Sequence, residues 1–334
     1  MMKSLLIEKA LTAAVREVDV PEPGEGQVRL RVEYVGICGS DLHYYFEGAN
    51  GAFVVREPLV PGHELSGRID FDPSGALAAG TPVTVHPARF GTPREGIENA
   101  PHLWPGGSYL GSASTWPHTQ GAASEYLIVE ADMVRVLPEG LPVRRAVLAE
   151  PLAVALHALG RAGDVAGLDV LVTGSGPIGL MAVAAAVAAG ARVTATDVLS
   201  GPLERARALG AEVTIDVSAD AVEPNTYAVV LECSGVPVSI STALKAVRPG
   251  GTVVQVGMLP DDPRPVNLAP FISKEVRYLG AFRFHHEIDH AVELLAANPG
   301  IETALTHEFA LTDAEQAFAT ARDSQLSGKV VFAL

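Results

Sequence analysis

Cysteine is scarce in this sequence, because only Cys38 and Cys233 occur among its 334 residues. Two cysteines so far apart in the chain do not form the disulfide framework of a small secreted protein, and they are typical of a reducing cytoplasm. The first residues, Met-Met-Lys-Ser-Leu-Leu-Ile-Glu, also lack the apolar core of a signal peptide. We therefore expect a cytoplasmic protein.

Positive charge is in deficit as well, with 24 Lys and Arg against 39 Asp and Glu and a net charge of −15. Such an acidic chain is a poor partner for nucleic acid or an anionic membrane. An apolar run over residues 168–189 is long enough to mimic a membrane span, but its Gly-Ser-Gly-Pro favours a strand, a turn and a helix. The length predicts two domains of roughly 150 residues each, and we expect the partner to be a small molecule.

The most informative stretch lies between Leu168 and Asp197. It contains, in order, an apolar β-branched strand, a glycine-rich turn, an alanine-rich helix, a second strand and an acid, at residues 168–173, 174–179, 178–189, 192–196 and 197. Strand, G-x-G-x-x-G, helix, strand and terminal acid form the dinucleotide-binding fingerprint. The pattern therefore predicts a site for a nicotinamide dinucleotide.

Each glycine of the turn has a predicted task. Gly174 allows the tight turn out of the strand, Gly176 lets a pyrophosphate approach the backbone, and Gly179 lets the helix pack close to the sheet. Pro177 and Ile178 begin the helix, whose unpaired N–H groups and positive dipole end face the phosphates. We assign these five residues to cofactor binding.

Three further residues complete the predicted cofactor site. Asp197 can accept hydrogen bonds from both ribose hydroxyls, and its charge would repel a 2′-phosphate, which favours NAD over NADP. Val256 and Gly257 end another predicted strand, over residues 252–257, and we assign them to the same site.

The two parts of the chain follow different patterns. Residues 1 to 145 contain short alternating strands and turns, with an irregular stretch rich in Gly, Pro, Ser and His at 87–121. From residue 146 onward strands and helices alternate, ending with a strand at 276–282. About six strands result, as a doubly wound parallel α/β sheet requires.

A second set of residues predicts a metal site. Cys38, His63 and Glu64 offer a thiolate, an imidazole and a carboxylate, which are all zinc ligands. Taken singly, Cys38 could instead be a small buried thiol, and His63-Glu64 a surface turn. Their occurrence ahead of a nucleotide-binding unit favours the metal site.

With these motifs, the chain resembles a zinc-dependent member of the medium-chain dehydrogenase/reductase superfamily, in the polyol dehydrogenase branch that includes sorbitol dehydrogenase and L-idonate 5-dehydrogenase. The segments that carry the resemblance are 36–43, 61–67, 150–154, 174–179 and 280–284, so it extends essentially from end to end. It implies a Rossmann domain at 148–283 inserted into a mainly-β GroES-like catalytic domain, at 1–147 and 284–334.

The resemblance also implies roles around one catalytic zinc. Cys38, His63 and Glu64 match the zinc ligands of the family. Glu150 matches a glutamate that either binds the metal or holds a metal-bound water. Asp41 matches a carboxylate that orients the ligand histidine.

Four more residues match the reacting part of the family site. Ser40 matches the hydroxyl that takes the proton from the substrate alcohol, and His43 matches the end of that relay toward solvent. Tyr44 and Arg283 match positions near the polyol hydroxyls. Packing for Tyr44 and pairing with an acid for Arg283 are the alternatives.

The chain departs from the family between His86 and Tyr109, where many relatives carry four cysteines that hold a structural zinc. No cysteine occurs there, so we expect one zinc per chain. His102 and His118 are expected to be loop histidines. A smaller departure follows Asp197, because Gly201-Pro202 stands where relatives often have a basic residue, which leaves the choice between NAD and NADP open.

We therefore expect an oxidoreductase that transfers a hydride between a polyol or sugar acid and NAD, with zinc as a Lewis acid on the substrate hydroxyl. L-idonate, oxidised to 5-ketogluconate, is the first substrate that the resemblance implies, and a homo-oligomer, a dimer or tetramer, is the expected assembly. A zinc-free NADPH-dependent reductase of the same superfamily and a non-catalytic nucleotide-binding homologue are the alternatives.

Overall fold

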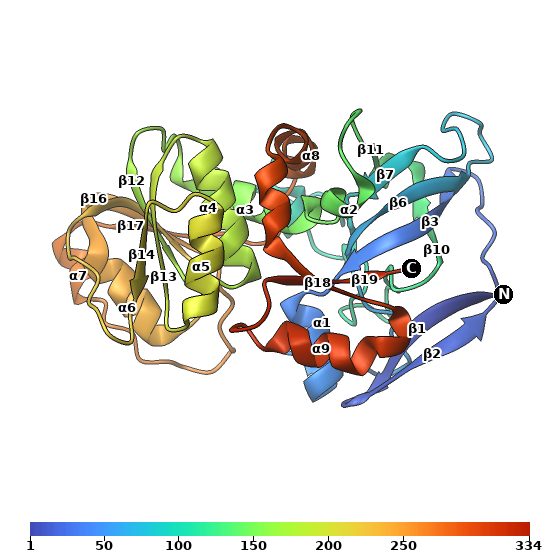
Figure 1. Ribbon diagram of the computed structural model, residues 1–334, viewed down its shortest axis with the longest axis horizontal. Coiled ribbons are helices and arrows are strands. Elements are labelled where there is room, and N and C mark those ends of the chain that lie inside the picture. Colours follow the sequence, from blue (N-terminus) through green and yellow to red (C-terminus); the bar gives the residue numbers. More distant parts are fainter.

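Two sheets of different construction organise the chain in the computed structural model, which describes residues 1–334 (Figure 1). The first is all parallel, and its six strands lie side by side in the order β14 (Val213–Asp216), β13 (Arg192–Asp197), β12 (Asp169–Thr173), β15 (Tyr227–Glu232), β16 (Val247–Gln255), β17 (Arg277–Gly280). This arrangement confirms the predicted doubly wound sheet.

Helices cover both faces of the parallel sheet. They are α3 (Ala149–Ala162), α4 (Pro177–Ala188), α5 (Ser200–Ala208), α6 (Pro237–Ala246) and the short α7 (Ala269–Ser273). Helices α3, α4 and α5 contribute to one apolar core, whereas α6 packs into a separate core on the other face. Strands buried on both sides by helices explain the nearly continuous apolar runs in this half of the sequence.

One strand boundary was wrong in the sequence interpretation. The structure begins β16 at Val247, whereas the pattern predicted a strand from Thr252 after a Pro-Gly-Gly turn. Val247 pairs with Tyr227 across a register shift, and Gly250 has a φ of 69° inside the strand. A glycine in that conformation allows an irregularity within a paired strand, which composition alone marks as a turn.

The second sheet is built from both ends of the chain. Its strands follow the order β11 (Val134–Val136), β7 (Pro82–Val85), β6 (Glu64–Phe71), β3 (Gln27–Gly36), β19 (Lys329–Ala333), β18 (Leu305–Phe309), and β10 (Tyr126–Glu130) also pairs with β3. The last strand of the chain therefore lies beside one of the first, with Val331 opposite Gly36.

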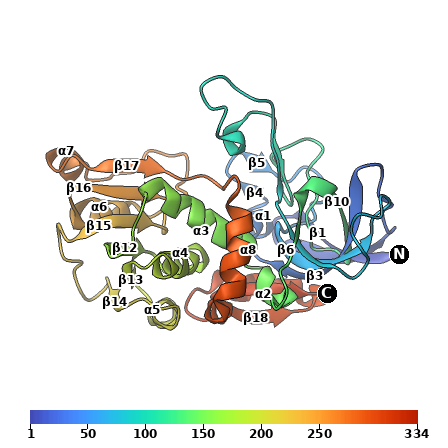
Figure 2. The same ribbon diagram turned by 90° about the horizontal axis from the view of Figure 1, so that it is seen from above.

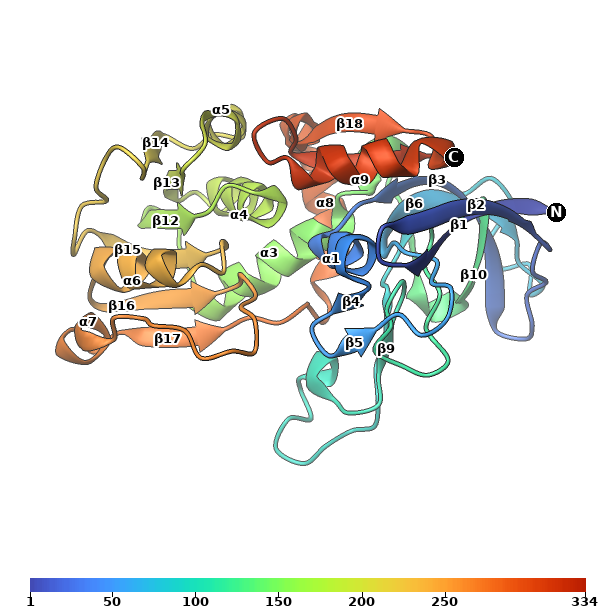
Figure 3. The ribbon, with the colours of Figure 1, turned by 90° about the horizontal axis from the view of Figure 1, so that it is seen from below.

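Smaller elements surround this sheet. They are β1 (Met2–Lys9), β2 (Thr12–Val18), α1 (Gly39–Glu47), β4 (Ala49–Asn50), β5 (Phe53–Val54), β8 (Ala88–Arg89), β9 (Ser108–Tyr109), α2 (Val143–Ala146), α8 (Glu287–Ala297) and α9 (Ala314–Arg322). Four short 3₁₀ turns, at 101–103, 131–133, 299–304 and 311–313, complete the structure. Helix α9 lies against β19 and beside the β1–β2 hairpin (Figure 3).

The two halves meet along α3 and α8. These helices pack on each other, and their buried residues share one apolar core with α2 (Figure 2). The segment between β8 and β9, where the expected irregular stretch lies, projects beside this junction (Figures 2 and 3). None of the helices is both long and apolar enough to cross a membrane.

Candidate active site

The structure brings Cys38, His63 and Glu64 together. Cys38 lies between the end of β3 and α1, and His63 and Glu64 stand at the start of β6. Pairing of Gly36 with Glu64 across β3 and β6 aligns the two segments. One ligand atom from each of the three side chains lies within 4.8 Å of the others. Sheet register therefore brings Cys38 to the adjacent pair His63 and Glu64, which lies 25 positions further along the chain.

The site carries several negatively charged side chains and is largely buried. Glu64 is fully buried, and its Oε2 has no hydrogen-bond partner. Burial opposes a charge on His63, but the thiolate of Cys38, together with Glu150 and Asp41, raises the pKa of His63 to about 10. A buried cluster of negative charge with one unsatisfied carboxylate oxygen attracts a cation, and a thiolate, an imidazole and a carboxylate suit zinc. The donor set therefore fits the predicted metal.

Glu150 approaches the same cluster from the other half of the molecule. It lies in the first turn of α3, is buried, and accepts a hydrogen bond from the Tyr109 hydroxyl at 2.5 Å. Burial raises the pKa of Glu150, and the charge of His63 opposes that rise. Tyr109 was not singled out in the sequence, since it meets Glu150 across 41 residues and belongs to no motif.

Asp41 supports the cluster through the backbone. Its carboxylate accepts from the N–H of Cys38 at 2.9 Å and from the N–H of Gly62 at 3.1 Å. The resemblance implied an action on the ligand histidine, but no hydrogen bond joins Asp41 to the ring of His63. Asp41 instead holds the backbone at Cys38 and next to His63, so that it links the two segments that carry the ligands.

Ser40 and His43 lie on α1, three residues apart and hence on the same face of the helix. Ser40 is half-buried, and His43 is exposed with Nδ1 2.9 Å from Oε1 of Glu47. No hydrogen bond joins Ser40 to His43, and a proton relay through the two residues stays a prediction.

Tyr44 and Arg283 have different surroundings. Tyr44 is 1% exposed, and its hydroxyl accepts from the N–H of Ala113 at 3.1 Å. The structure thus shows packing for Tyr44, and its contact with a substrate stays a prediction. Arg283 pairs with no acid, and its guanidinium carbon lies 4.1 Å from the centre of the Tyr109 ring. The structure therefore shows Arg283 over an aromatic ring and not in an ion pair.

The glycine-rich turn has the shape that a phosphate-binding loop needs. Gly174 has a φ of 82°, and a Cβ on Gly179 would lie 1.9 Å from the carbonyl oxygen of Gly174. A Cβ on Gly176 would meet nothing within 4 Å, so the space above it is open. Helix α4 begins at Pro177, and Ile178 follows in its first turn. Open space at a helix N-terminus suits a pyrophosphate.

Asp197 ends β13 beside this turn. Its Oδ2 accepts from the N–H of Ser175 at 2.8 Å, and its Oδ1 accepts from the N–H groups of Val198 and Leu199. These bonds fix the carboxylate at the edge of the glycine turn, where the second strand of a dinucleotide fold meets the ribose.

Val256 and Gly257 follow the end of β16. Both N–H groups donate to the carbonyl of Glu232 at 2.8 Å, and a Cβ on Gly257 would lie 2.1 Å from the nitrogen of Gly235. The side chain of Glu232, which the sequence analysis missed, is fully buried and accepts from Thr173 and from the 234–239 segment. Glu232 therefore ties together the loops at the carboxyl ends of β12, β15 and β16.

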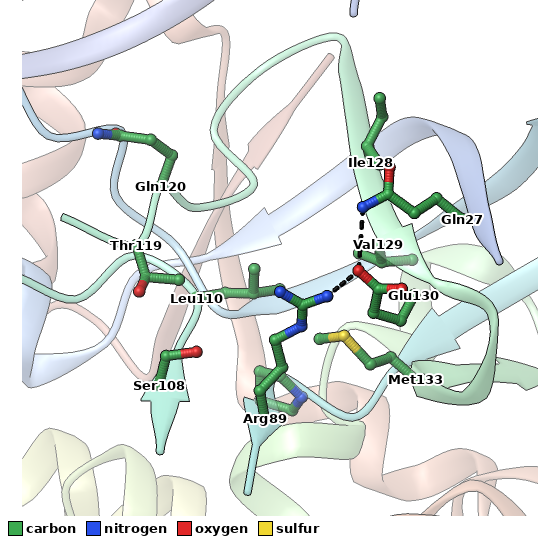
Figure 4. Close-up of a pocket in the computed structure, with 11 residues that line it drawn as sticks. Gln27, Arg89, Ser108, Leu110, Thr119, Gln120, Ile128, Val129, Glu130 and Met133 are labelled. Atoms are coloured by element: carbon green, nitrogen blue, oxygen red, sulfur yellow. Dashed lines mark hydrogen bonds and ion pairs between the residues drawn. The ribbon is translucent and has the colours of Figure 1, made fainter. Parts of the chain in front are cut away.

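A separate cavity of about 210 Å³ lies at the base of the projecting segment (Figure 4). Arg89 forms an ion pair with Glu130, which also accepts from Nε2 of Gln27 at 2.9 Å. None of the predicted site residues lines this cavity, and its charged groups satisfy one another.

Two protein-family models match the chain, one in each half. The model of the alcohol dehydrogenase GroES-like domain matches residues 24–139, and that of zinc-binding dehydrogenase matches residues 177–297. The chain belongs to the zinc-binding dehydrogenase family. This dehydrogenase is therefore an oxidoreductase of the medium-chain alcohol and polyol dehydrogenase type.

Individual relatives are similar over their full length. L-idonate 5-dehydrogenase (NAD(P)(+)) of Escherichia coli is 33% identical, over 98% of this chain and 97% of that protein. Sorbitol dehydrogenase of Gallus gallus is 34% identical, over 96% and 93%. The crystal structure of E. coli L-idonate 5-dehydrogenase aligns with a TM-score of 0.93 at 32% identity, covering 100% of this chain and 98% of that one. A zinc-binding dehydrogenase of Sinorhizobium meliloti bound to NADP aligns with a TM-score of 0.89 at 28% identity, covering 100% and 99%.

The two loop histidines have separate surroundings in this dehydrogenase. The ring of His118 accepts from the N–H of Arg56 at 2.9 Å and lies 3.0 Å from the carbonyl oxygen of Thr115, and its backbone N–H donates to Glu57 at 2.7 Å. His102 lies beside the rings of His157 and His285. His102 lies in the 3₁₀ turn of the segment between β8 and β9, and His118 lies in the loop that follows β9.

Proposed function

We propose that this dehydrogenase oxidises a secondary alcohol of a polyol or sugar acid with NAD, using a single zinc ion held by Cys38, His63 and Glu64. The observation that carries the proposal is the convergence of these three donors within 4.8 Å, next to Glu150. A soft thiolate together with harder nitrogen and oxygen donors suits zinc, and three protein ligands leave a position for substrate.

The chain's own residues then have distinct roles. When bound, zinc supplies Lewis-acid stabilisation of negative charge on the substrate oxygen, and the nicotinamide supplies the hydride acceptor. Glu150, which accepts a hydrogen bond from Tyr109, lies beside the three donors and would either bind the metal or hold a water next to it. Ser40 accepts the substrate proton, and His43 passes it to solvent from the exposed end of the relay. Arg283 contributes N–H donors to the hydroxyl or carboxylate groups of the substrate.

Asp197 supports NAD as the preferred cofactor. Its carboxylate would repel a 2′-phosphate. Hydrogen bonds from the backbone N–H groups of Ser175 and Val198 hold this carboxylate at the turn. The pyrophosphate of the cofactor would bind at the glycine-rich turn and the start of α4, at Gly174, Gly176, Pro177, Ile178 and Gly179. The nicotinamide end would lie near Val256 and Gly257.

The substrate that we propose first is L-idonate, with 5-ketogluconate as its product. Support comes from the similarity to E. coli L-idonate 5-dehydrogenase over nearly the whole length of both chains. Sorbitol dehydrogenases are similar to the same extent, so neutral polyols belong in the same test.

We further propose a cytoplasmic homo-oligomer with domains at 1–147 plus 284–334 and at 148–283. Strand β17 is an edge of the parallel sheet, and the chain from Leu268 to Phe282 that contains it has exposed apolar side chains at Leu268, Ile272, Tyr278 and Phe282. An unpaired edge with apolar neighbours is a surface that commonly pairs with a second copy. Helix α8 shares its core with α3, so the proposed domains meet over that helix.

A substrate panel tests the proposal. L-idonate, D-gluconate, sorbitol, xylitol and 2,3-butanediol are offered with NAD and with NADP, and zinc is measured on the same preparation. We expect one zinc per chain and the highest kcat/KM for a sugar acid or polyol with NAD. Two tightly bound zinc ions would contradict the single site. An enone is offered with NADPH in a parallel assay, and its reduction by protein that contains no zinc would identify a zinc-free reductase.

A further inference from the structure

A lysine lies buried directly beside the candidate metal cluster. Lys329 is the first residue of β19, and it is 3% exposed. Its Nζ lies 2.7 Å from Oε1 of Glu64 and 3.1 Å from the carbonyl oxygen of Ile37. The C-terminal strand thus delivers a side chain to a site otherwise built from residues 38–64 and 150.

The pairing of Lys329 with Glu64 accounts for a lysine at this buried position. Fully buried lysines are rare unless they are paired, so the ammonium and the carboxylate stabilise each other here. Breaking such a pair on one side leaves an uncompensated buried charge.

Because of this pairing, the two carboxylate oxygens of Glu64 have different partners. Oε1 is held by Lys329, whereas Oε2 is buried without a hydrogen-bond partner. Oε2 lies against Gly36, where a Cβ would come within 2.1 Å of it. The two oxygens of Glu64 therefore have different surroundings, and only Oε1 is held by a hydrogen-bond donor.

We propose that Lys329 is a positioning residue that holds one oxygen of Glu64 and so prevents this carboxylate from binding the zinc through both oxygens. Zinc with a bidentate carboxylate would fill a coordination position that the substrate needs. The ammonium also competes with the metal for the negative charge of Glu64, so the site holds zinc less tightly than its donors alone would. This inference rests on the metal site of the proposed function.

The test compares Lys329→Gln, which removes the charge but keeps an N–H donor, with Lys329→Arg, which keeps the charge. Each protein is loaded with Co²⁺ in place of zinc, and the visible absorption spectrum is recorded without substrate. For Lys329→Gln we expect weaker d–d absorption, as the coordination number rises, and zinc affinity about tenfold higher in chelator competition. Lys329→Arg should keep the wild-type spectrum. A wild-type spectrum and zinc affinity in Lys329→Gln would overturn the proposal.

A double-mutant cycle keeps the test decisive if Lys329→Gln alone does not fold. Glu64→Gln cannot bind a metal through two carboxylate oxygens, and the double variant Glu64→Gln/Lys329→Gln also removes the ammonium that the single change leaves unpaired. A thiolate-to-cobalt charge-transfer band in both proteins first establishes that each holds cobalt, and we then expect the two to give the same d–d spectrum. A spectral change on removing Lys329 in the Glu64→Gln background would refute the assigned role. If the wild type itself shows no thiolate-to-cobalt charge-transfer band, the metal site fails, which is a different result from failure of Lys329.

Discussion

Removing the Tyr109 hydroxyl tests whether Glu150 must be held to act. In Tyr109→Phe the ring remains. The guanidinium carbon of Arg283 can still lie 4.1 Å from its centre, and the ring of His63 can still pack against it with 5.3 Å between the ring centres. Only the donor to Oε1 of Glu150, at 2.5 Å, is lost. Burial raises the pKa of Tyr109 well above its ordinary value, so the wild-type phenol remains a donor at neutral pH.

The size of the effect follows from the environment of Glu150. A hydrogen bond to a charged group contributes about 1.5–3 kcal/mol, and a buried acceptor that loses its donor cannot turn to bulk water. At about 1.4 kcal/mol per factor of ten, the loss corresponds to roughly a 10- to 100-fold lower kcat/KM if Glu150 orients the substrate in the transition state. NADH affinity should not change, because the glycine turn and Asp197 lie on other elements.

Steady-state kinetics with the best polyol or sugar acid, together with NADH fluorescence titration, measures both quantities on one protein. Tyr126→Phe is the matched control, since Tyr126 also lies beneath an arginine, with the Arg29 guanidinium carbon 5.7 Å from its ring centre, but its hydroxyl makes no hydrogen bond. An unchanged kcat/KM in folded Tyr109→Phe would refute the reasoning. An equal loss of kcat/KM in Tyr126→Phe would show that the effect comes from a general loss of stability and not from Glu150.

Three further predictions concern the cofactor, the metal and pH. Asp197→Ala should raise the KM for NAD and narrow its advantage over NADP in paired kinetic assays; a wild-type enzyme with a better kcat/KM for NADP would contradict the assignment. Cys38→Ser should lose zinc and most turnover yet retain NADH binding, and turnover that persists without zinc would argue against the thiolate ligand. Burial opposes the charge of Glu287, but its 2.8 Å bond with His157 and backbone donors lower the pKa of Glu287 to about 2. Its stabilising effect should therefore be complete above its ordinary pKa of 4.5 and be lost as pH falls from there toward 2. The difference in unfolding free energy between wild type and Glu287→Gln, measured with urea, should shrink over that range; a constant difference would exclude the linkage.

The sequence by itself was sufficient for the dinucleotide unit. Residues 168–197 specify their strand, turn, helix and strand through local periodicity and glycine chemistry, and the structure places β12, α4 and β13 there with shifts of one residue. The donor types of Cys38, His63 and Glu64 were also evident, because metal preference depends on chemical identity. The family assignment that these motifs implied is shown by the full-length relatives.

Only the tertiary structure decided how the site is held. Tyr109 meets Glu150 across 41 residues, and Lys329 meets Glu64 across 265, so no local pattern connects either pair. Asp41 could be placed near the ligands from the sequence, but its bonds to backbone N–H groups depend on the path of the chain at Gly62. Periodicity and spacing describe neighbours within a few turns or strand residues. Contacts between distant segments arise from sheet register and packing, which exist only once the chain has folded.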